Sequence, residues 1–116
     1  MFTFRKWFDL VRRVARGERV ECRGGGKEVH AADVARAVEL LLSADGIAGQ
    51  VYNCYDRYVS QHEVATIAKS LSASGAEIVG QPSVPKHQIA TEKLRQIGML
   101  FGGRPLLEKT IGAMLE

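Results

Sequence analysis

The chain has 116 residues, of which 46% are hydrophobic and 25% are charged, and its formal net charge is +3. This length and composition indicate one globular domain (residues 1–116) with a modest core, without repeats or low-complexity tracts. No apolar run approaches the roughly 20 residues of a membrane-spanning helix, and the charged start is unlike a secretory signal, so we expect a cytoplasmic protein with no membrane association.

The N-terminal segment is predicted to form an amphipathic helix. Six apolar residues recur at helical spacing (Phe4, Trp7, Phe8, Val11, Val14 and Ala15), and Gly17 is placed to end the helix. Basic residues outnumber acidic ones in the first thirty positions, and four arginines lie mainly elsewhere around this helix (Arg5, Arg12, Arg13 and Arg16). A core helix with a solvated basic face explains the pattern, and binding to a membrane surface or a nucleic acid is an alternative.

A glycine-rich loop and a second helix follow. Residues 24–26 are three glycines, which permit a tight reversal and the close approach of another group. After a short extended step at residues 28–30, apolar residues return at helical spacing (Val34, Ala37, Val38, Leu41 and Leu42). Asp33 falls in the first turn of this helix, where a carboxylate is favoured by the free backbone N–H groups.

The middle of the chain contains the segment most typical of a β-strand. Residues 50–55 are rich in Val and Tyr and short enough for the core of a sheet. Ser60 and Glu63 form a capping box, in which the hydroxyl accepts a free N–H and the glutamate reaches back to the cap's own N–H. The helix that begins there ends near residues 72–75 and is predicted to bury four apolar residues (Val64, Ile67, Ala68 and Leu71).

The last third of the chain alternates short elements with loops. Residues 77–79 are a strand candidate, and a loop with Pro82 and Pro85 leads to a brief helix at residues 91–97. Pro105 suits the first turn of a final helix, whose apolar stripe has five members (Leu106, Leu107, Ile111, Met114 and Leu115). The sequence predicts a small mixed α/β domain of about four to five helices with short strands.

The two cysteines, Cys22 and Cys54, are too few for a disulfide framework and lack the Cys-x-x-Cys spacing of many metal sites. We expect Cys54 to act as a small buried hydrophobic residue, because a nucleophilic thiol needs an electropositive setting that the sequence does not provide. No His, Asp and Glu cluster occurs at metal-ligand spacing, so we predict no metal site.

Several segments resemble one protein family. Residues 29–38 (VHAADVARAV) are similar to the HVDDVARA segment found late in NAD-dependent epimerases and dehydratases, the extended short-chain dehydrogenase/reductase family. Residues 49–53 (GQVYN) resemble its GEVYN strand, residues 60–65 its next helix start, and residues 93–98 (KLRQIG) its KLRxLG turn. The resemblance runs from about residue 14 to the end, with the segments in the family's order and spacing.

The resemblance covers only the C-terminal part of such an enzyme. The Gly-x-x-Gly-x-x-Gly turn that binds the cofactor is missing, because Gly46-Ile47-Ala48-Gly49 lacks the third glycine and precedes a predicted strand. The Tyr-x-x-x-Lys pair is also missing, since no tyrosine is followed four residues later by lysine. The resemblance therefore implies a substrate-binding portion without its Rossmann half, with no catalytic residue and no bound cofactor of its own, although NAD(P) is implied for the full-length family.

The resemblance also implies which residues contact substrate. A basic residue ahead of the VH step binds the nucleotide diphosphate in the family, and Lys27 is the nearest match here, with Arg23 a second candidate. Lys86 and His87 match the basic position ahead of the family's IDTSKL step, although Ala90 stands where an aspartate is common. Arg104 is placed either to face the pocket or to serve solubility. Lysine is a point charge and not a bidentate fork, so we expect looser specificity. Without the rest of the cleft, we expect the isolated chain to bind a nucleotide sugar weakly.

Three functions are compatible with these features. The first is the substrate-binding segment of a nucleotide-sugar epimerase or dehydratase, inactive in isolation, in which the basic N-terminal helix guides an anionic nucleotide. The second is a module that pairs with a partner or with itself, as a homo-oligomer, through the surface that the Rossmann half would cover. The third and least expected is a basic nucleic-acid or membrane-surface binder, whose affinity would fall steeply with salt.

Overall fold

The computed structural model describes residues 4–85 and 89–116. Over these residues the chain forms five helices, α1 (Phe4–Ala15), α2 (Ala31–Ser43), α3 (Gln61–Ser72), α4 (Glu92–Gln96) and α5 (Gly103–Met114). It also forms four short strands, β1 (Val20–Glu21), β2 (Gly25–Glu28), β3 (Arg57–Ser60) and β4 (Ile78–Val79). The predicted mixed α/β class with about five helices and short strands is confirmed.

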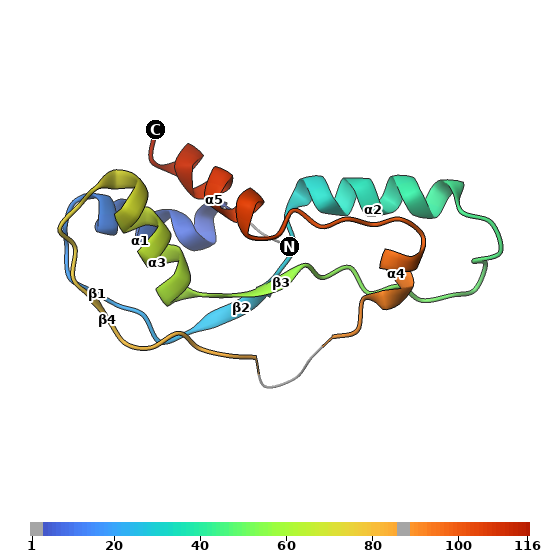
Figure 1. Ribbon diagram of the computed structural model, residues 1–116, viewed down its shortest axis with the longest axis horizontal. Coiled ribbons are helices and arrows are strands. Elements are labelled where there is room, and N and C mark those ends of the chain that lie inside the picture. The colour runs from blue at the N-terminus through green and yellow to red at the C-terminus, as the bar shows by residue number, and fades with distance from the viewer. Residues whose placement is uncertain (1–3, 86–88) are drawn as a thin grey trace.

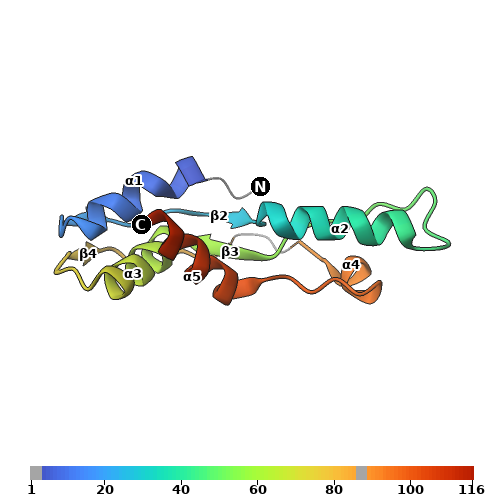
Figure 2. The ribbon, with the colours of Figure 1, turned by 90° about the horizontal axis from the view of Figure 1, so that it is seen from above.

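The elements form two lobes along an elongated molecule. Helices α1, α3 and α5 gather with β1 and β4 at one end, and α2 and α4 lie at the other, with β2 and β3 between them (Figure 1). Figure 2, seen from above, shows the same division. The extents are 53 × 31 × 19 Å and the radius of gyration is 16.2 Å, against about 13 Å for a compact chain of this length. We call the two parts the α1–α3–α5 lobe and the α2–α4 lobe.

The α1–α3–α5 lobe contains the main hydrophobic core. Trp7, Val11 and Val14 of α1 are buried against α3 and α5, so the predicted apolar face of the first helix is confirmed at these positions. It is wrong at Phe8, which is 42% exposed, and at Ala15, which is also exposed. The side chain of Phe4 lies outside those that the structure describes. Gly17 ends α1 with a φ of +80°, its N–H donating to Val14 O at 2.9 Å. Glu18 N–H donates to Arg13 O at 3.1 Å, and the two bonds form the Schellman motif.

The strands form two separate pairs. β1 and β4 pair in parallel, with Val20 opposite Ile78, and β2 and β3 pair antiparallel, with Gly25 opposite Ser60. Two of the three glycines predicted as a loop are therefore in a strand. The reason is close approach, because a Cβ on Gly25 would lie 2.7 Å from both Tyr58 Oη and Val59 O.

The α2–α4 lobe has a much smaller core. Ala37, Leu94 and Met99 are the buried residues of its hydrophobic cluster. α2 begins at N-cap His30, whose Nδ1 accepts the Ala32 N–H at 3.0 Å. Two members of its apolar stripe face solvent, since Val38 is 50% and Leu42 84% exposed. The helix is therefore formed as its spacing predicts, but only part of its apolar surface is covered.

The strand predicted at residues 50–55 is wrong, because residues 50–56 belong to no helix or strand. The hydrogen bonds that hold this segment involve side chains and not a strand ladder. Lys93 Nζ donates to Val51 O at 3.0 Å, and Asn53 Nδ2 donates to Ala90 O at 3.2 Å. β-propensity favours a strand only where another strand can pair with it, and β2 pairs with the following residues instead.

Other predicted elements are closer to the structure. α3, β4, α4 and α5 occur where their patterns predict them. In α3, Val64, Ile67 and Ala68 are buried, but the prediction that Leu71 is buried is wrong, because it is 53% exposed in the last turn. The apolar stripe of α5 is buried at three positions (Leu107, Ile111 and Met114).

Candidate functional site

Two adjoining hollows lie on either side of Tyr58. The first, the Arg104 cleft, has a volume of about 470 Å³ and includes Arg57, His62 and Arg104 in its lining. The second, the Lys27 groove, has a volume of about 540 Å³ and is lined by a cationic and glycine-rich segment that runs from Arg23 to Lys27. Tyr58, Ser83 and Pro85 line both hollows.

A hydrogen bond between Tyr58 and Ser83, which belong to distant segments, separates the hollows. We call this pair the Tyr58–Ser83 wall. Tyr58 Oη and Ser83 Oγ are 2.8 Å apart. Tyr58 comes from β3, and Ser83 comes from the loop that follows β4. The alternation of side chains along β3 places Val59 in the core and turns Tyr58 toward the hollows, so two hydroxyl groups stand at the centre of the site.

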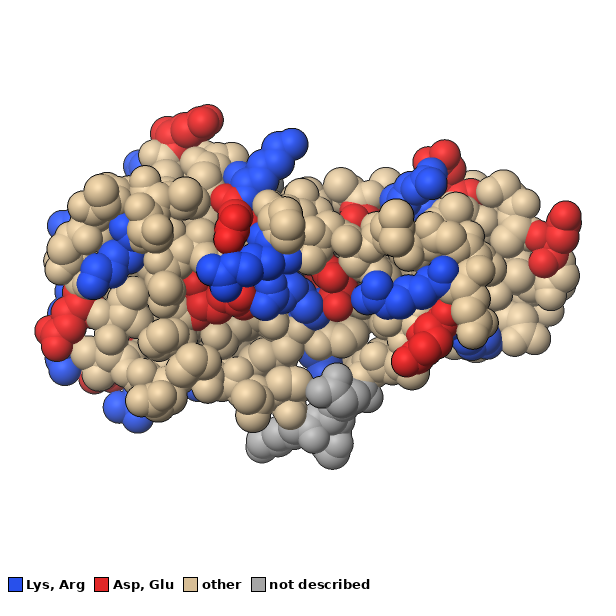
Figure 3. Space-filling model, viewed as in Figure 1, with Lys and Arg blue, Asp and Glu red and all other residues tan. Residues whose placement is uncertain are grey.

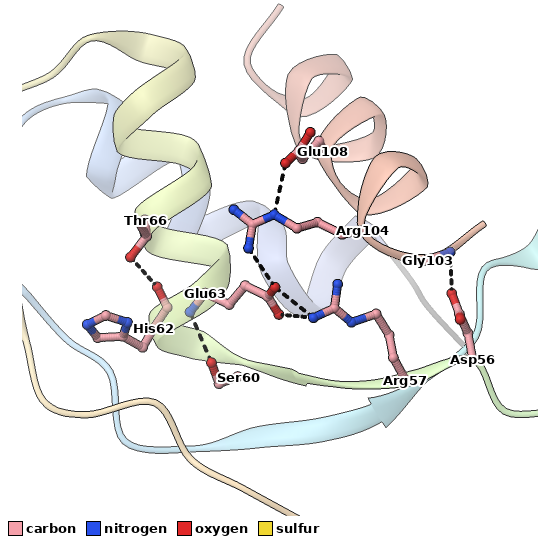
Figure 4. A network of polar contacts seen from close by, with 9 residues as sticks. All are labelled: Asp56, Arg57, Ser60, His62, Glu63, Thr66, Gly103, Arg104 and Glu108. Atoms are coloured by element: carbon pink, nitrogen blue, oxygen red, sulfur yellow. Dashed lines mark hydrogen bonds and ion pairs between the residues drawn. The ribbon is translucent and has the colours of Figure 1, made fainter. Parts of the chain in front are cut away.

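One side of the Arg104 cleft is an ion-pair network centred on Glu63 (Figure 4). Arg57 Nη2 donates to both Glu63 carboxylate oxygens, at 2.9 and 2.7 Å. Arg104 Nη1 donates to Glu63 Oε2 at 3.0 Å, and Arg104 Nε donates to Glu108 Oε1 at 2.9 Å. Figure 3 shows basic and acidic side chains gathered near the middle of the molecule. The network fixes the arginines and partly neutralises them.

The capping box of α3 is therefore formed in one half only. Ser60 Oγ accepts the Glu63 N–H at 3.0 Å, as predicted. The Glu63 carboxylate, which was expected to reach back to the cap, bonds instead to Arg57 and Arg104. The backbone of Ser60 belongs to β3, and two guanidinium groups give a carboxylate stronger hydrogen bonds than one neutral N–H does.

The surroundings of Arg104 keep its guanidinium group charged and in a fixed position. Its contacts with Glu108 and Glu63 hold the pKa of Arg104 above its ordinary value. A guanidinium carries more N–H donors than these contacts use. Arg104 thus remains charged in a constrained position at the edge of the cleft, with donors left for an anionic or hydroxyl-bearing ligand.

The structure brings together some of the predicted substrate-binding residues. Arg23 and Lys27 line the same groove, and Arg104 lies in the adjoining cleft across the Tyr58–Ser83 wall. Lys86 and His87 lie outside the described residues. Sequence reasoning missed four residues of the site (Arg57, Tyr58, Glu63 and Ser83), and only Glu63, through its capping-box position, carried a recognisable signal.

Comparison with known proteins adds no family to this geometry. No model of a known protein family matches the chain, and no curated protein matches it either. The resemblance to the extended short-chain dehydrogenases consequently stays a prediction, and the site is interpreted from its own residues.

Other chemistries find little support in the part of the chain that the structure describes. Burial raises the pKa of the Cys22 and Cys54 thiols, which lowers the fraction of reactive thiolate. Among residues 4–85 and 89–116, no group of three or more His, Cys, Asp or Glu side chains is placed to hold a metal ion. Within the same residues, no helix has the length and apolar character needed to cross a bilayer.

The basic face of α1 is partly paired. Arg13 Nε and Arg16 Nε donate to the two carboxylate oxygens of Glu18, at 3.4 and 2.7 Å, and the Arg12 guanidinium lies 5.3 Å from the Phe8 ring centroid. With Trp7, Val11 and Val14 buried in the core, α1 is a core helix on which Arg12 is exposed and Arg13 is half-buried.

Proposed function

We propose that this chain is the substrate-binding segment of an NAD-dependent epimerase or dehydratase of the extended short-chain dehydrogenase/reductase family, acting on a nucleotide-activated sugar. The Lys27 groove and the Arg104 cleft together hold that substrate, and the chain alone transfers no hydride. The observation that supports the proposal is the adjoining position of the two hollows, with cationic side chains in each and two hydroxyl groups between them.

The chemistry of a nucleotide sugar suits such a pair of hollows. Its diphosphate carries negative charge between two hydroxyl-rich groups, so it requires cations near the middle and hydrogen-bond partners on both sides. Arg23 and Lys27 supply exposed positive charge, and Tyr58 and Ser83 supply hydroxyls beside it. Because exposed charge pairs contribute only about 0–1 kcal/mol in water, we expect the isolated chain to bind in the millimolar range.

NAD(P) is assigned to no residue of this chain. In the structure, Gly46 and Gly49 lie in the loop after α2 and do not join a strand to a helix, so they do not provide a phosphate-binding turn. The nicotinamide would be held and used by the remainder of such an enzyme, which in the family is the Rossmann half.

The test is an NMR titration of the ¹⁵N-labelled chain with UDP-glucose and dTDP-glucose at millimolar concentrations. We expect saturable shifts around the Lys27 groove and the Arg104 cleft, and a loss of about threefold in affinity for Lys27→Ala, the scale of one exposed charge contact. Arg36→Ala, on the outer face of α2, is the matched control and should bind as the parent chain does.

Two results of this titration would contradict the proposal. Shifts spread along the arginines of α1 would indicate general attraction of anions. Equal affinity for inorganic pyrophosphate and the nucleotide sugars would show that neither the sugar nor the base is recognised.

We infer a second candidate function, self-association, from the α2–α4 lobe. This lobe leaves several large apolar side chains exposed (Val38, Leu42, Val51 and Leu100). It also holds residues 51–56, which belong to no helix or strand. An apolar surface beside a segment with no strand partner suits pairing with a second copy of the chain.

Light scattering with size-exclusion chromatography over a concentration series tests self-association. We expect a dimer that Leu42→Lys dissociates, because the substitution puts a charge into the proposed interface. Leu71→Lys, at an exposed apolar residue of the other lobe, is the control and should leave the dimer intact. A monomer at every concentration would overturn this second candidate.

A further inference from the structure

The N-terminus of α5 is capped by residues that are distant in the sequence. Its N-cap is Gly102, which has no side chain to offer, and its first turn holds no acidic residue. Two carboxylates from elsewhere take that place. Asp33 Oδ2 accepts the Gly102 N–H at 3.0 Å, and Asp56 Oδ2 accepts the Gly103 N–H at 2.8 Å. Carboxylates at this position satisfy free N–H groups and oppose the positive end of the helix dipole.

The two carboxylates come from segments that are distant in the sequence. Asp33 lies in the first turn of α2, in the α2–α4 lobe, and Asp56 directly precedes β3. Both are held in place, since Asp33 is 8% exposed and the Asp56 N–H donates to Glu28 O at 3.1 Å. Their shared target is the start of α5, which belongs to the other lobe. The contact therefore connects the two lobes through backbone groups.

The contact also leads directly to the Arg104 cleft. Arg104 follows Gly103 in α5, and Arg57 follows Asp56. Because Arg57 and Arg104 both bond to Glu63, these residues form a closed ring of contacts through Asp56, Arg57, Glu63, Arg104 and Gly103 (Figure 4). In a closed ring, the position of each member is constrained from two sides.

Glycine is required at the clamped turn. Gly103 has a φ of +58°, in the left-handed region that other residues rarely adopt. A Cβ on Gly102 would lie 2.4 Å from Leu106 Cδ2. Without side chains, the two amides can present their N–H groups side by side to the two carboxylates.

We propose that Asp33 and Asp56 form a clamp on the Gly102 and Gly103 amides that positions Arg104 in its cleft and fixes the orientation of the two lobes. Asp56 is a positioning residue, because it acts on Arg104 through Gly103, with which it lines a small cavity. The inference concerns the placement of Arg104 and holds whichever ligand the cleft binds.

The clamp contains a group that titrates unusually. Burial has the largest effect on Asp56 and raises its pKa. The Gly103 N–H, Arg57 and Arg95 lower this pKa and the charge of Asp33 raises it, so that the net result is a raised pKa. Glu28 and His30 line the same small cavity of about 20 Å³. As the pH falls, Asp56 takes up its proton before an ordinary aspartate does, and a neutral carboxyl is a weaker acceptor than a carboxylate.

The test is a pH titration of the ¹⁵N-labelled full chain by NMR, observing the Gly102 and Gly103 amides and the Arg104 Nε–H. In the parent chain, the Gly103 amide should shift with an apparent pKa above the ordinary value of an aspartate, about 3.9. In Asp56→Ala, hydrogen exchange at Gly103 should be about tenfold faster, the scale of one lost charged hydrogen bond, and the Arg104 Nε–H signal should move.

The conservative variant separates positioning from general damage. Asp56→Asn keeps an oxygen acceptor without the charge, so it should restore the Arg104 Nε–H signal and abolish the titration of Gly103. The proposal is overturned if the Arg104 signal is the same in Asp56→Ala as in the parent chain. It is also overturned if the Gly103 amide of the parent chain titrates at or below the ordinary pKa of an aspartate, about 3.9, a result that needs no variant to fold.

Discussion

Helices α1 and α2 differ in how well the molecule covers them, although their sequences predict similar elements. They have 12 and 13 residues and both carry apolar residues at helical spacing. α1 buries Trp7, Val11 and Val14 against α3 and α5, whereas α2 leaves Val38 and Leu42 exposed. Hydrophobic periodicity therefore predicts that a helix forms. How much of the helix is buried depends on the number of long helices that pack against it.

The largest difference between the lobes should be seen in their cores. Ile111 is fully buried in the α1–α3–α5 lobe, and Leu42 is 84% exposed in the α2–α4 lobe. We expect Ile111→Ala to lower the free energy of unfolding by about 2–5 kcal/mol, and Leu42→Ala to change it by less than about 0.5 kcal/mol. Urea denaturation followed by circular dichroism measures both. Similar effects at the two positions would show that α2 is covered in solution.

The parallel strand pair gives a second test of the better-packed lobe. Gly80 has a φ of +115°, and a Cβ there would lie 2.3 Å from Cys22 O, beside the β1–β4 pair. We expect Gly80→Ala to cost about 1–3 kcal/mol through backbone strain. Gly75→Ala is the matched control, because a Cβ there would meet nothing within 4 Å. Equal denaturation midpoints for the two variants would contradict the close approach of Gly80 to Cys22.

The ion-pair network centred on Glu63 should have a smaller effect on the free energy of unfolding. Glu63 is only 15% exposed and bonds to two arginines, whereas Glu39 makes an exposed pair with Arg36 on α2. We expect Glu63→Gln to cost about 1–2 kcal/mol, because charged hydrogen bonds are lost from a half-buried site. Glu39→Gln should cost less than about 0.5 kcal/mol. If thermal unfolding shows a larger loss of stability for Glu39→Gln than for Glu63→Gln, the network does not stabilise the fold.

The smallest expected effect is the pH dependence of the clamp between the lobes. Because burial raises the pKa of Asp56 in the folded state, its protonated form favours folding, and this contribution is lost as the pH rises through the folded-state pKa. The stability of the parent chain relative to Asp56→Asn should therefore increase as the pH falls from neutral toward the ordinary range of an aspartate. Urea midpoints at several pH values measure this difference. A constant difference would mean that the folded-state pKa of Asp56 is not raised.

The elements of the fold could largely be predicted from the sequence, because the signals are local. Gly17 ends α1 and Ser60 caps α3 as their residue types predict. The strand at residues 50–55 was predicted wrongly, because its high β-propensity carries no information about whether a partner strand is present. The exposure of Leu71 was also not predicted, because helical spacing does not show where the neighbouring elements end.

The candidate site was only partly predictable. Arg23, Lys27 and Arg104 were selected from the sequence and line the two hollows, but their role as ligand contacts stays a prediction. The Tyr58–Ser83 wall joins residues 25 positions apart, and no local pattern connects them. Asp33 and Gly102 are 69 positions apart, and the periodicity of the sequence does not predict their contact either.

The sequence by itself determined the mixed α/β class, most helix positions and the basic character of the residues that came to line the hollows. These properties follow from side-chain spacing, capping groups and charge, which act within a few residues of each other. Only the tertiary structure decided the division into two lobes, the pairing of β2 with β3 and the clamp of Asp33 and Asp56 on the start of α5. Those features depend on which distant groups meet, and that is set by packing of the whole chain.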